Sequence, residues 1–216
     1  MIPKIIHHIW VGNNEFPKKF KEFIEKWKIL YPDYNYIFWN DELVESTKII
    51  DESISKYYYS KCKMAFKADL LRFKILERYG GVYIDTDVEP LKRMPDEFLS
   101  YKLFAGRQKP YPEVAIGLIG AEPNNDLVIY YNKKMIENIE LNIDSDGNIS
   151  QELWRITGPQ YFNKICNEYL DKEYYKFFDS EYFHPYGWNE LERRNENFKE
   201  TCPNAYSVHH WALSWW

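Results

Sequence analysis

Cysteine is scarce in this sequence, and no long apolar run is present. The three cysteines, Cys62, Cys166 and Cys202, are widely spaced, odd in number and never arranged as C-x-x-C. This pattern argues against a disulfide framework and against a zinc knuckle. We therefore expect the protein to work in a reducing compartment.

Positive charge is also in short supply. Lys and Arg number 28 against 33 Asp and Glu, a net charge of −5, and no stretch forms a dense basic patch. Nucleic acid is therefore not an expected partner. The opening I-P-K-I-I-H-H-I-W-V is apolar, but it is too short and too interrupted for a signal peptide or a membrane span. We expect a cytoplasmic protein, with peripheral contact at the inner face of a membrane as the alternative.

The chain does have enough apolar content for a core. Of its 216 residues 45% are hydrophobic, and there is no internal repeat or long linker, so we expect residues 1–216 to form a single domain. Aromatic residues reach 19%. Core packing is the simpler explanation for this aromatic content, and stacking on sugars or bases is the more specific alternative.

Hydrophobic periodicity predicts an α/β fold. Residues 5–11 and 34–39 are typical of strands, and residues 17–31 between them have helical spacing. Such a β-α-β start favours an open sheet with ligand sites at the carboxyl ends of its strands. Further strands are predicted at 82–84, 103–107, 114–119, 177–183 and 205–208, and helices at 64–78, 125–141 and 159–170. The charged segment 190–199 is predicted to be solvated and mobile.

Two carboxylates, Asp85 and Asp87, follow the short apolar strand at 82–84. In isolation, D-x-D is more often a turn that solvates itself. At the end of a buried strand, the pair suits a hard divalent cation and, through it, a diphosphate. In the preceding helix Asp69 and Arg72 are three residues apart and share one face, where they either form an ion pair or reach one ligand together.

The stretch A-D-L-L-R-F-K-I-L-E-R-Y-G-G-V-Y-I-D-T-D-V-E-P-L, residues 68–91, resembles glycosyltransferases of the DXD sugar-binding family, glycosyltransferase family 32. That family is related to the Golgi initiating mannosyltransferase and to the clostridial toxin glucosyltransferase domains. The opening I-P-K-I-I-H-H-I-W-V-G and the later T-G-P-Q-Y-F and H-H-W-A-L-S-W are similar to the family's pattern too. The resemblance implies a GT-A type domain with a central mixed sheet flanked by helices.

The resemblance also implies roles for the motif residues. Asp87 would bind Mn²⁺ or Mg²⁺ directly, and Asp85 would contact the sugar or ribose and reach the metal through water. Asp69 and Arg72 would contact the donor sugar, with Arg72 also near its phosphates. The family has Ser before the helix Asp, whereas this sequence has Ala68, which removes one polar contact to the donor.

Further implied roles lie outside the motif. Trp10 would stack on the base of the nucleotide, and Ser214 and Trp215 would belong to a C-terminal loop that closes over the diphosphate. His209 stands where related folds supply a third metal ligand, with His210 as the alternative. His7 and His8, by contrast, lie in the first predicted strand and are expected to be structural.

The resulting hypothesis is a metal-dependent, retaining glycosyltransferase. It would move a hexose from a nucleotide sugar, with a UDP-sugar favoured over a GDP-sugar, to an oligosaccharide or lipid-linked glycan acceptor in surface polysaccharide synthesis. One alternative is a phosphotransferase of the haloacid dehalogenase type with Asp85 as nucleophile. Another is a non-catalytic carbohydrate-binding domain.

Residues 142–153 begin like a calcium-binding EF-hand loop, but Leu153 stands where the bidentate Glu belongs, so an acidic surface turn is the preferred interpretation.

Overall fold

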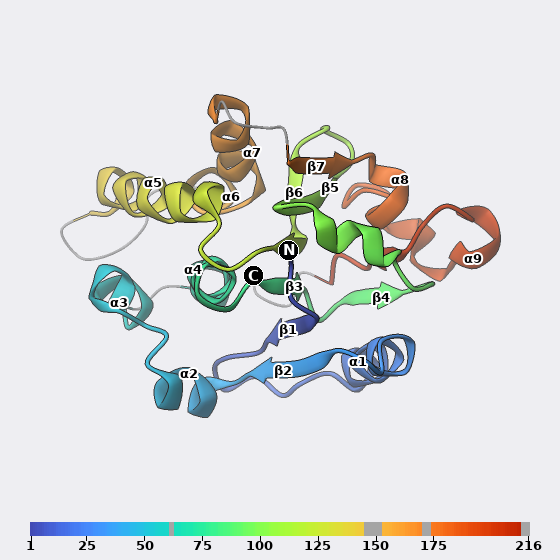
Figure 1. Cartoon of the computed structure of the whole chain (residues 1–216), viewed down its shortest axis with the longest axis horizontal. Coiled ribbons are helices and arrows are strands. Elements are labelled where there is room, and N and C mark those ends of the chain that lie inside the picture. Colours follow the sequence, from blue (N-terminus) through green and yellow to red (C-terminus); the bar gives the residue numbers. More distant parts are fainter. Residues whose placement is uncertain (61–62, 145–152, 170–173, 213–216) are drawn as a thin grey trace.

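The computed structural model describes residues 1–60, 63–144, 153–169 and 174–212 (Figure 1). The strands are β1 (Ile5–Ile9), β2 (Asn35–Trp39), β3 (Gly81–Ile84), β4 (Val88–Pro90), β5 (Leu103–Arg107), β6 (Val114–Ala121), β7 (Tyr175–Phe178) and β8 (Ser207–His209). The α-helices are α1 (Lys18–Leu30), α2 (Asp41–Thr47), α3 (Glu52–Tyr58), α4 (Met64–Tyr79), α5 (Asp126–Asn142), α6 (Leu153–Ile156), α7 (Pro159–Glu168), α8 (Ser180–Phe183) and α9 (Phe198–Thr201). Two 3₁₀ helices are η1 (Asp96–Ser100) and η2 (Leu191–Asn195).

Six of these strands form a mixed sheet in the order β2-β1-β3-β6-β5-β7. The pairs β2–β1, β1–β3 and β5–β7 are parallel, while β6 is antiparallel to both β3 and β5. The sheet runs through the middle of the molecule, with helices on both sides (Figure 1). The predicted mixed α/β architecture is confirmed.

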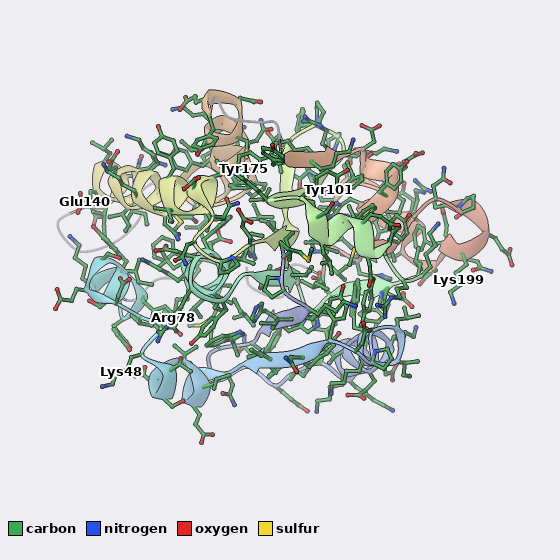
Figure 2. The ribbon with its side chains drawn as sticks, viewed as in Figure 1. Lys48, Arg78, Tyr101, Glu140, Tyr175 and Lys199 are labelled. Carbon is green, nitrogen blue, oxygen red and sulfur yellow. The ribbon has the colours of Figure 1, made fainter. Side chains whose placement is uncertain are left out.

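Each face of the sheet has its own core. Alternation along β5 shows the division, because Leu103 and Ala105 pack with α4, α5 and α7, whereas Phe104 packs with Trp27 of α1 and Phe183 of α8. Such alternation is the two-residue period of a strand that is buried on both faces. Figure 2 shows the charged side chains of Lys48, Glu140 and Lys199 at the rim of the molecule. The central strands, including β3, are therefore held from both sides.

Two predictions about the C-terminal third are wrong. Residues 177–183 are not one strand, because β7 ends at Phe178 and α8 begins at Ser180. Residues 190–199 are not merely solvated, because they contain η2 and the start of α9. Phe198 is buried and stacks on Tyr186, with ring centroids 5.3 Å apart.

A separate two-stranded sheet joins the middle of the chain to its C-terminal part. β4 and β8 are antiparallel, and Val88 is paired with His209. Arg194 braces the end of β8, since its Nε donates to the carbonyl of His210 at 2.6 Å and its Nη2 donates to the carbonyl of Trp211. This pairing brings His209 beside the segment that carries the two aspartates.

Within the described ranges, no helix combines the length and apolar character needed to cross a bilayer.

Candidate active site

A tight turn between β3 and β4 holds the two aspartates. The amide of Asp85 donates to the carbonyl of Gly117 on β6 at 2.7 Å, and the amide of Val88 donates back to the carbonyl of Asp85 at 3.1 Å. Asp87 lies within that turn, and its own carbonyl accepts from the amide of His210 at 3.0 Å. The backbone of the D-x-D segment is thus fixed by β6 on one side and by the end of β8 on the other.

Each of the two carboxylates has one anchored oxygen. Oδ1 of Asp85 accepts from the Tyr83 hydroxyl at 2.6 Å and from Nη2 of Arg72 at 2.9 Å. Oδ2 of Asp87 accepts from the amide of Ala212 at 2.8 Å. The other oxygens face Nε2 of His209, at 3.9 Å for Oδ2 of Asp85 and 3.0 Å for Oδ1 of Asp87. Anchoring therefore directs one oxygen from each acid toward the same point.

Asp85, Asp87 and His209, hereafter the ligand set, fit a divalent cation. One ligand atom from each residue lies within 4.8 Å of the others. Two carboxylate oxygens and one imidazole nitrogen suit Mg²⁺ or Mn²⁺, and the imidazole favours Mn²⁺. Space at the set depends on Gly117, because a Cβ there would lie 2.9 Å from Oδ2 of Asp85 and 3.1 Å from Nδ1 of His209.

The charges of the ligand set depend on one another. Burial by itself would raise the pKa of Asp87, but the His209 imidazole and the Ala212 amide lower that pKa to about 2. Burial would likewise lower the pKa of His209, but the carboxylates of Asp87 and Asp85 raise it above its usual value. A metal ion binding here would therefore compete with a proton on His209.

Arg72 links the ligand set to a second buried acid. Its side chain is 5% exposed, and its Nη1 lies 3.3 Å from Oδ1 of Asp69. Oδ2 of Asp69 accepts from the Thr157 hydroxyl at 2.9 Å. Burial raises the pKa of Asp69 to about 7, although Arg72 and Thr157 both oppose this shift. Arg72 thus holds Asp85 in place while it also faces Asp69.

The structure separates the two C-terminal histidines. His209 belongs to the ligand set, whereas Nε2 of His210 lies 2.9 Å from Oε2 of Glu89. The His210 ring also stacks on Phe23, with centroids 4.9 Å apart. Of the two candidates, only His209 is placed with the D-x-D pair.

The remaining predicted site residues are placed less directly. Trp10 is 7% exposed, packs against Phe16 and Phe20, and its indole N–H donates to the carbonyl of Asn14 at 2.9 Å. Ala212, whose amide binds Asp87, packs against the same cluster. The base-stacking role of Trp10 stays a prediction. Ser214 and Trp215 lie outside the described residues, as does most of the 142–153 segment.

Sequence reasoning missed the residues that position the predicted ones. Tyr83 was indistinguishable from any apolar residue of a buried strand, and Gly117 lies in a predicted strand with no local signal. Thr157 belongs to the T-G-P-Q-Y-F pattern, but nothing in that pattern predicts that its hydroxyl binds Asp69. These contacts join β3, β6, α4 and the turn between α6 and α7, so they require the tertiary structure.

Comparison with known proteins matches residues 17–105 to the glycosyltransferase sugar-binding region containing the DXD motif. An uncharacterised glycosyltransferase of Acanthamoeba polyphaga mimivirus is 30% identical over 227 residues, which cover 100% of this chain and 84% of that protein. Inositol phosphoceramide mannosyltransferase 2 of Schizosaccharomyces pombe is 30% identical over 172 residues, 78% of this chain. The alignment covers 47% of that enzyme, so this chain spans about half of its length.

Solved structures share the fold at low sequence identity. The PaToxG glycosyltransferase has a TM-score of 0.64 at 19% identity, covering 79% of this chain and 71% of that one. The catalytic domain of alpha-toxin from Clostridium novyi has a TM-score of 0.56 at 12% identity, covering 77% of this chain and 72% of that one. The predicted GT-A type fold is confirmed, and the haloacid dehalogenase alternative is set aside. Together with the viral relative and the ligand set, these findings show that the chain belongs to the family of glycosyltransferases whose sugar-binding region contains the DXD motif.

Proposed function

We propose that this glycosyltransferase moves a hexose from a nucleoside diphosphate sugar to a glycan hydroxyl in a metal-dependent reaction that retains anomeric configuration. One observation carries the proposal. Asp85 and Asp87 each have one oxygen anchored by the protein and one directed at Nε2 of His209. A pair of acids that merely ended a strand would not need this division between anchored and presented oxygens.

A divalent cation held by the ligand set would stabilise the negative charge that develops on the departing diphosphate. The chain's own residues prepare that position. Arg72 and Tyr83 keep Asp85 from rotating, and the amide of Ala212 does the same for Asp87. We favour Mn²⁺ over Mg²⁺ because His209 contributes an imidazole nitrogen.

The donor is proposed from the relatives and neighbours. The matched yeast enzymes are named as mannosyltransferases of inositol phosphoceramide, which supports a hexose donor and a lipid-linked or oligosaccharide acceptor. A glycosyltransferase domain of the YGT toxin was solved with UDP bound, at a TM-score of 0.56 and 11% identity. We therefore place UDP-sugars before GDP-sugars. We further propose a role in surface polysaccharide synthesis at the cytoplasmic face of a membrane.

Retention is proposed from how the nearby acids are used. Asp69 is held by Arg72 and Thr157, and the two acids of the D-x-D segment belong to the ligand set. Among the described acids around this site, none is left to form a covalent glycosyl intermediate. This supports departure of the diphosphate and attack by the acceptor on the same face of the sugar.

A thermal-shift screen with Mn²⁺ and single UDP- or GDP-hexoses tests the donor, because a ligand that binds the folded protein raises its melting temperature by mass action. The stabilising donor should then release its nucleoside diphosphate only when metal is present. Stabilisation without any release of nucleoside diphosphate would support the carbohydrate-binding alternative. Full activity in excess chelator would overturn the metal-dependent proposal.

A further inference from the structure

His184 is a buried histidine with no assigned role beside the ligand set. It follows α8 directly and has no exposed surface. Within the described ranges neither ring nitrogen makes a well-formed hydrogen bond, and the carbonyl of Arg107 is a polar neighbour of the ring. Nδ1 of His209 is likewise buried and without a described partner. Buried polar atoms in native proteins are nearly always hydrogen-bonded, so these nitrogens call for an explanation.

The two rings are neighbours. The centroids of His184 and His209 lie 5.8 Å apart, with an interplanar angle of 57°. At this separation the rings are direct neighbours, and a hydrogen bond between them requires ring nitrogens on their facing edges. The buried, unpartnered nitrogens of His184 and Nδ1 of His209 can therefore satisfy each other.

Two glycines on adjacent strands make room for this approach. A Cβ at Gly106 of β5 would lie 3.0 Å from Nδ1 of His184, and a Cβ at Gly117 of β6 would lie 3.1 Å from Nδ1 of His209. The strands are antiparallel neighbours, and both glycines lie where their register shifts, between the pairs Ala105–Ile119 and Arg107–Val114. A side chain at either position would press on the imidazole above it.

The chemistry of the two rings sets the direction of the bond. His209 presents Nε2 to the carboxylates, so as a metal ligand it uses the Nε2 lone pair and keeps a hydrogen on Nδ1. The ring of His184 has no exposed surface, and such burial favours a neutral imidazole, which has one N–H and one acceptor nitrogen. With its N–H turned to the nearby carbonyl of Arg107, the other nitrogen of His184 can accept.

We propose that His184 is a positioning residue that accepts a hydrogen bond from Nδ1–H of His209 and so keeps Nε2 of His209 directed at Asp85 and Asp87. The proposal rests on the metal-dependent function proposed above. It adds a residue that touches neither metal nor substrate. The resulting chain of contacts runs from the backbone of β5 through His184 to the ligand set.

Long-range proton–nitrogen correlation spectra of ¹⁵N-labelled protein test the bond without any sugar donor. The protein contains five histidines. Two serve as internal references, because Nε2 of His7 binds the carbonyl of Gly80 at 2.8 Å and Nδ1 of His8 binds that of Ile84 at 2.8 Å. We expect Nδ1 of His209 to carry a hydrogen, as in His8, and a His184→Phe substitution to shift its resonance. A bare Nδ1 on His209, or a resonance unmoved by the substitution, would overturn the proposal.

Mn²⁺ affinity measured by electron paramagnetic resonance provides the second readout. His184→Phe should weaken Mn²⁺ binding by about 10- to 100-fold, as is usual when a group that orients a metal ligand is lost. His184→Gln keeps an acceptor and should restore most of the affinity, which a purely structural role would not predict. His7→Phe, at an equally buried histidine that binds the carbonyl of Gly80, is the matched control. Equal affinity in wild type and both His184 variants would contradict the proposal.

The two proposals can fail separately. If His184→Phe does not fold, the wild-type spectrum and the His184→Gln affinity still decide the inference. Intact Nδ1–H bonding with no sugar transfer from any donor would contradict the proposed function alone. Metal-dependent transfer together with a bare Nδ1 on His209 would contradict the role of His184 alone.

Discussion

The dipeptide His-His occurs twice in the sequence, and the two copies have different partners and different roles. His7 and His8 lie in β1, in the interior of the sheet, and both bind backbone carbonyls. His209 is the last residue of β8 and His210 follows it, and they face the carboxylates of Asp87 and Glu89 respectively. Neighbouring residues of a strand point to opposite faces, so in each pair the two rings have separate surroundings.

The groups that the rings contact, more than the extent of burial, explain why the two histidine pairs differ in pKa. Burial lowers the pKa of His7 to about 4 and that of His8 to about 3, and their carbonyl partners only partly offset this. His209 is also buried, yet Asp87 and Asp85 raise its pKa. An imidazole against neutral backbone stays uncharged and structural, whereas one against two acids can bind a proton or a cation.

The largest effect is predicted for a substitution that removes a carboxylate facing the C-terminal histidine pair. Asp87→Ala should reduce sugar transfer by at least about 100- to 1000-fold, because it deletes a directed ligand of the proposed metal. Steady-state rates with Mn²⁺ and the donor from the screen measure this. Asp126→Ala, at an exposed acid that begins α5, is the matched control and should keep wild-type rates. A wild-type transfer rate in Asp87→Ala would contradict the proposed metal-binding role of Asp87 and His209.

The two members of the C-terminal pair should differ from each other. His209→Ala removes an imidazole of the ligand set and should weaken Mn²⁺ binding by at least about 10- to 100-fold. His210→Ala removes the contact to Glu89 and the stacking on Phe23, and it should leave Mn²⁺ binding unchanged, at a cost of about 1–2 kcal/mol in the free energy of unfolding. Paramagnetic resonance and urea unfolding separate the outcomes. Equal loss of metal affinity in both variants would show that the separation of roles is wrong.

The N-terminal pair should affect stability alone. His7→Phe removes the bond to the carbonyl of Gly80 and leaves the indole N–H of Trp39 without its acceptor. The free energy of unfolding should fall by about 1–3 kcal/mol. Transfer rate per folded molecule should stay at the wild-type value. A fall in that rate without a fall in stability would place His7 in the active site.

Asp69 is a buried acid without a histidine partner, and it can be compared with the buried Asp87, which faces His209. The pKa of Asp69 is raised to about 7, so the folded protein binds this proton more tightly than the unfolded chain, where an Asp pKa is about 3.9. Stability should therefore fall as pH rises from about 4 to 7, by at most about 1.4 kcal/mol per pH unit from this group. Urea unfolding in chelator at several pH values should show a shallower decline for Asp69→Asn. An identical pH dependence for both proteins would show that Asp69 is ionised throughout.

Local patterns predicted the elements around the site well. The helix at 64–78, the glycine stop and the strand at 82–84 all match α4 and β3, because periodicity and turn residues are local signals. The convergence of Asp85, Asp87 and His209 was expected from the family resemblance. Its geometry was not, because the β4–β8 pairing has no signature in either short strand.

The errors have physical causes as well. Aromatic residues at 177–183 are typical of strands, yet the chain turns after Phe178 and Phe183 packs from a helix. The charges at 190–199 indicate solvent, yet Arg194 uses its charge on backbone carbonyls at the end of β8. His184 gave no signal, because a single histidine between Phe and Pro reveals nothing about the ring it will meet.

The pairing of β4 with β8 has a consequence for how the enzyme matures. His209 is supplied by a strand that follows the D-x-D segment by more than half of the chain, and the amide of Ala212 anchors Asp87 from the same region. A growing polypeptide would complete its core sheet and expose both acids before either contact existed. Such an intermediate would lack the third ligand and would bind the proposed metal more weakly, so the enzyme would reach its full capacity to use nucleotide sugar only once β8 had docked.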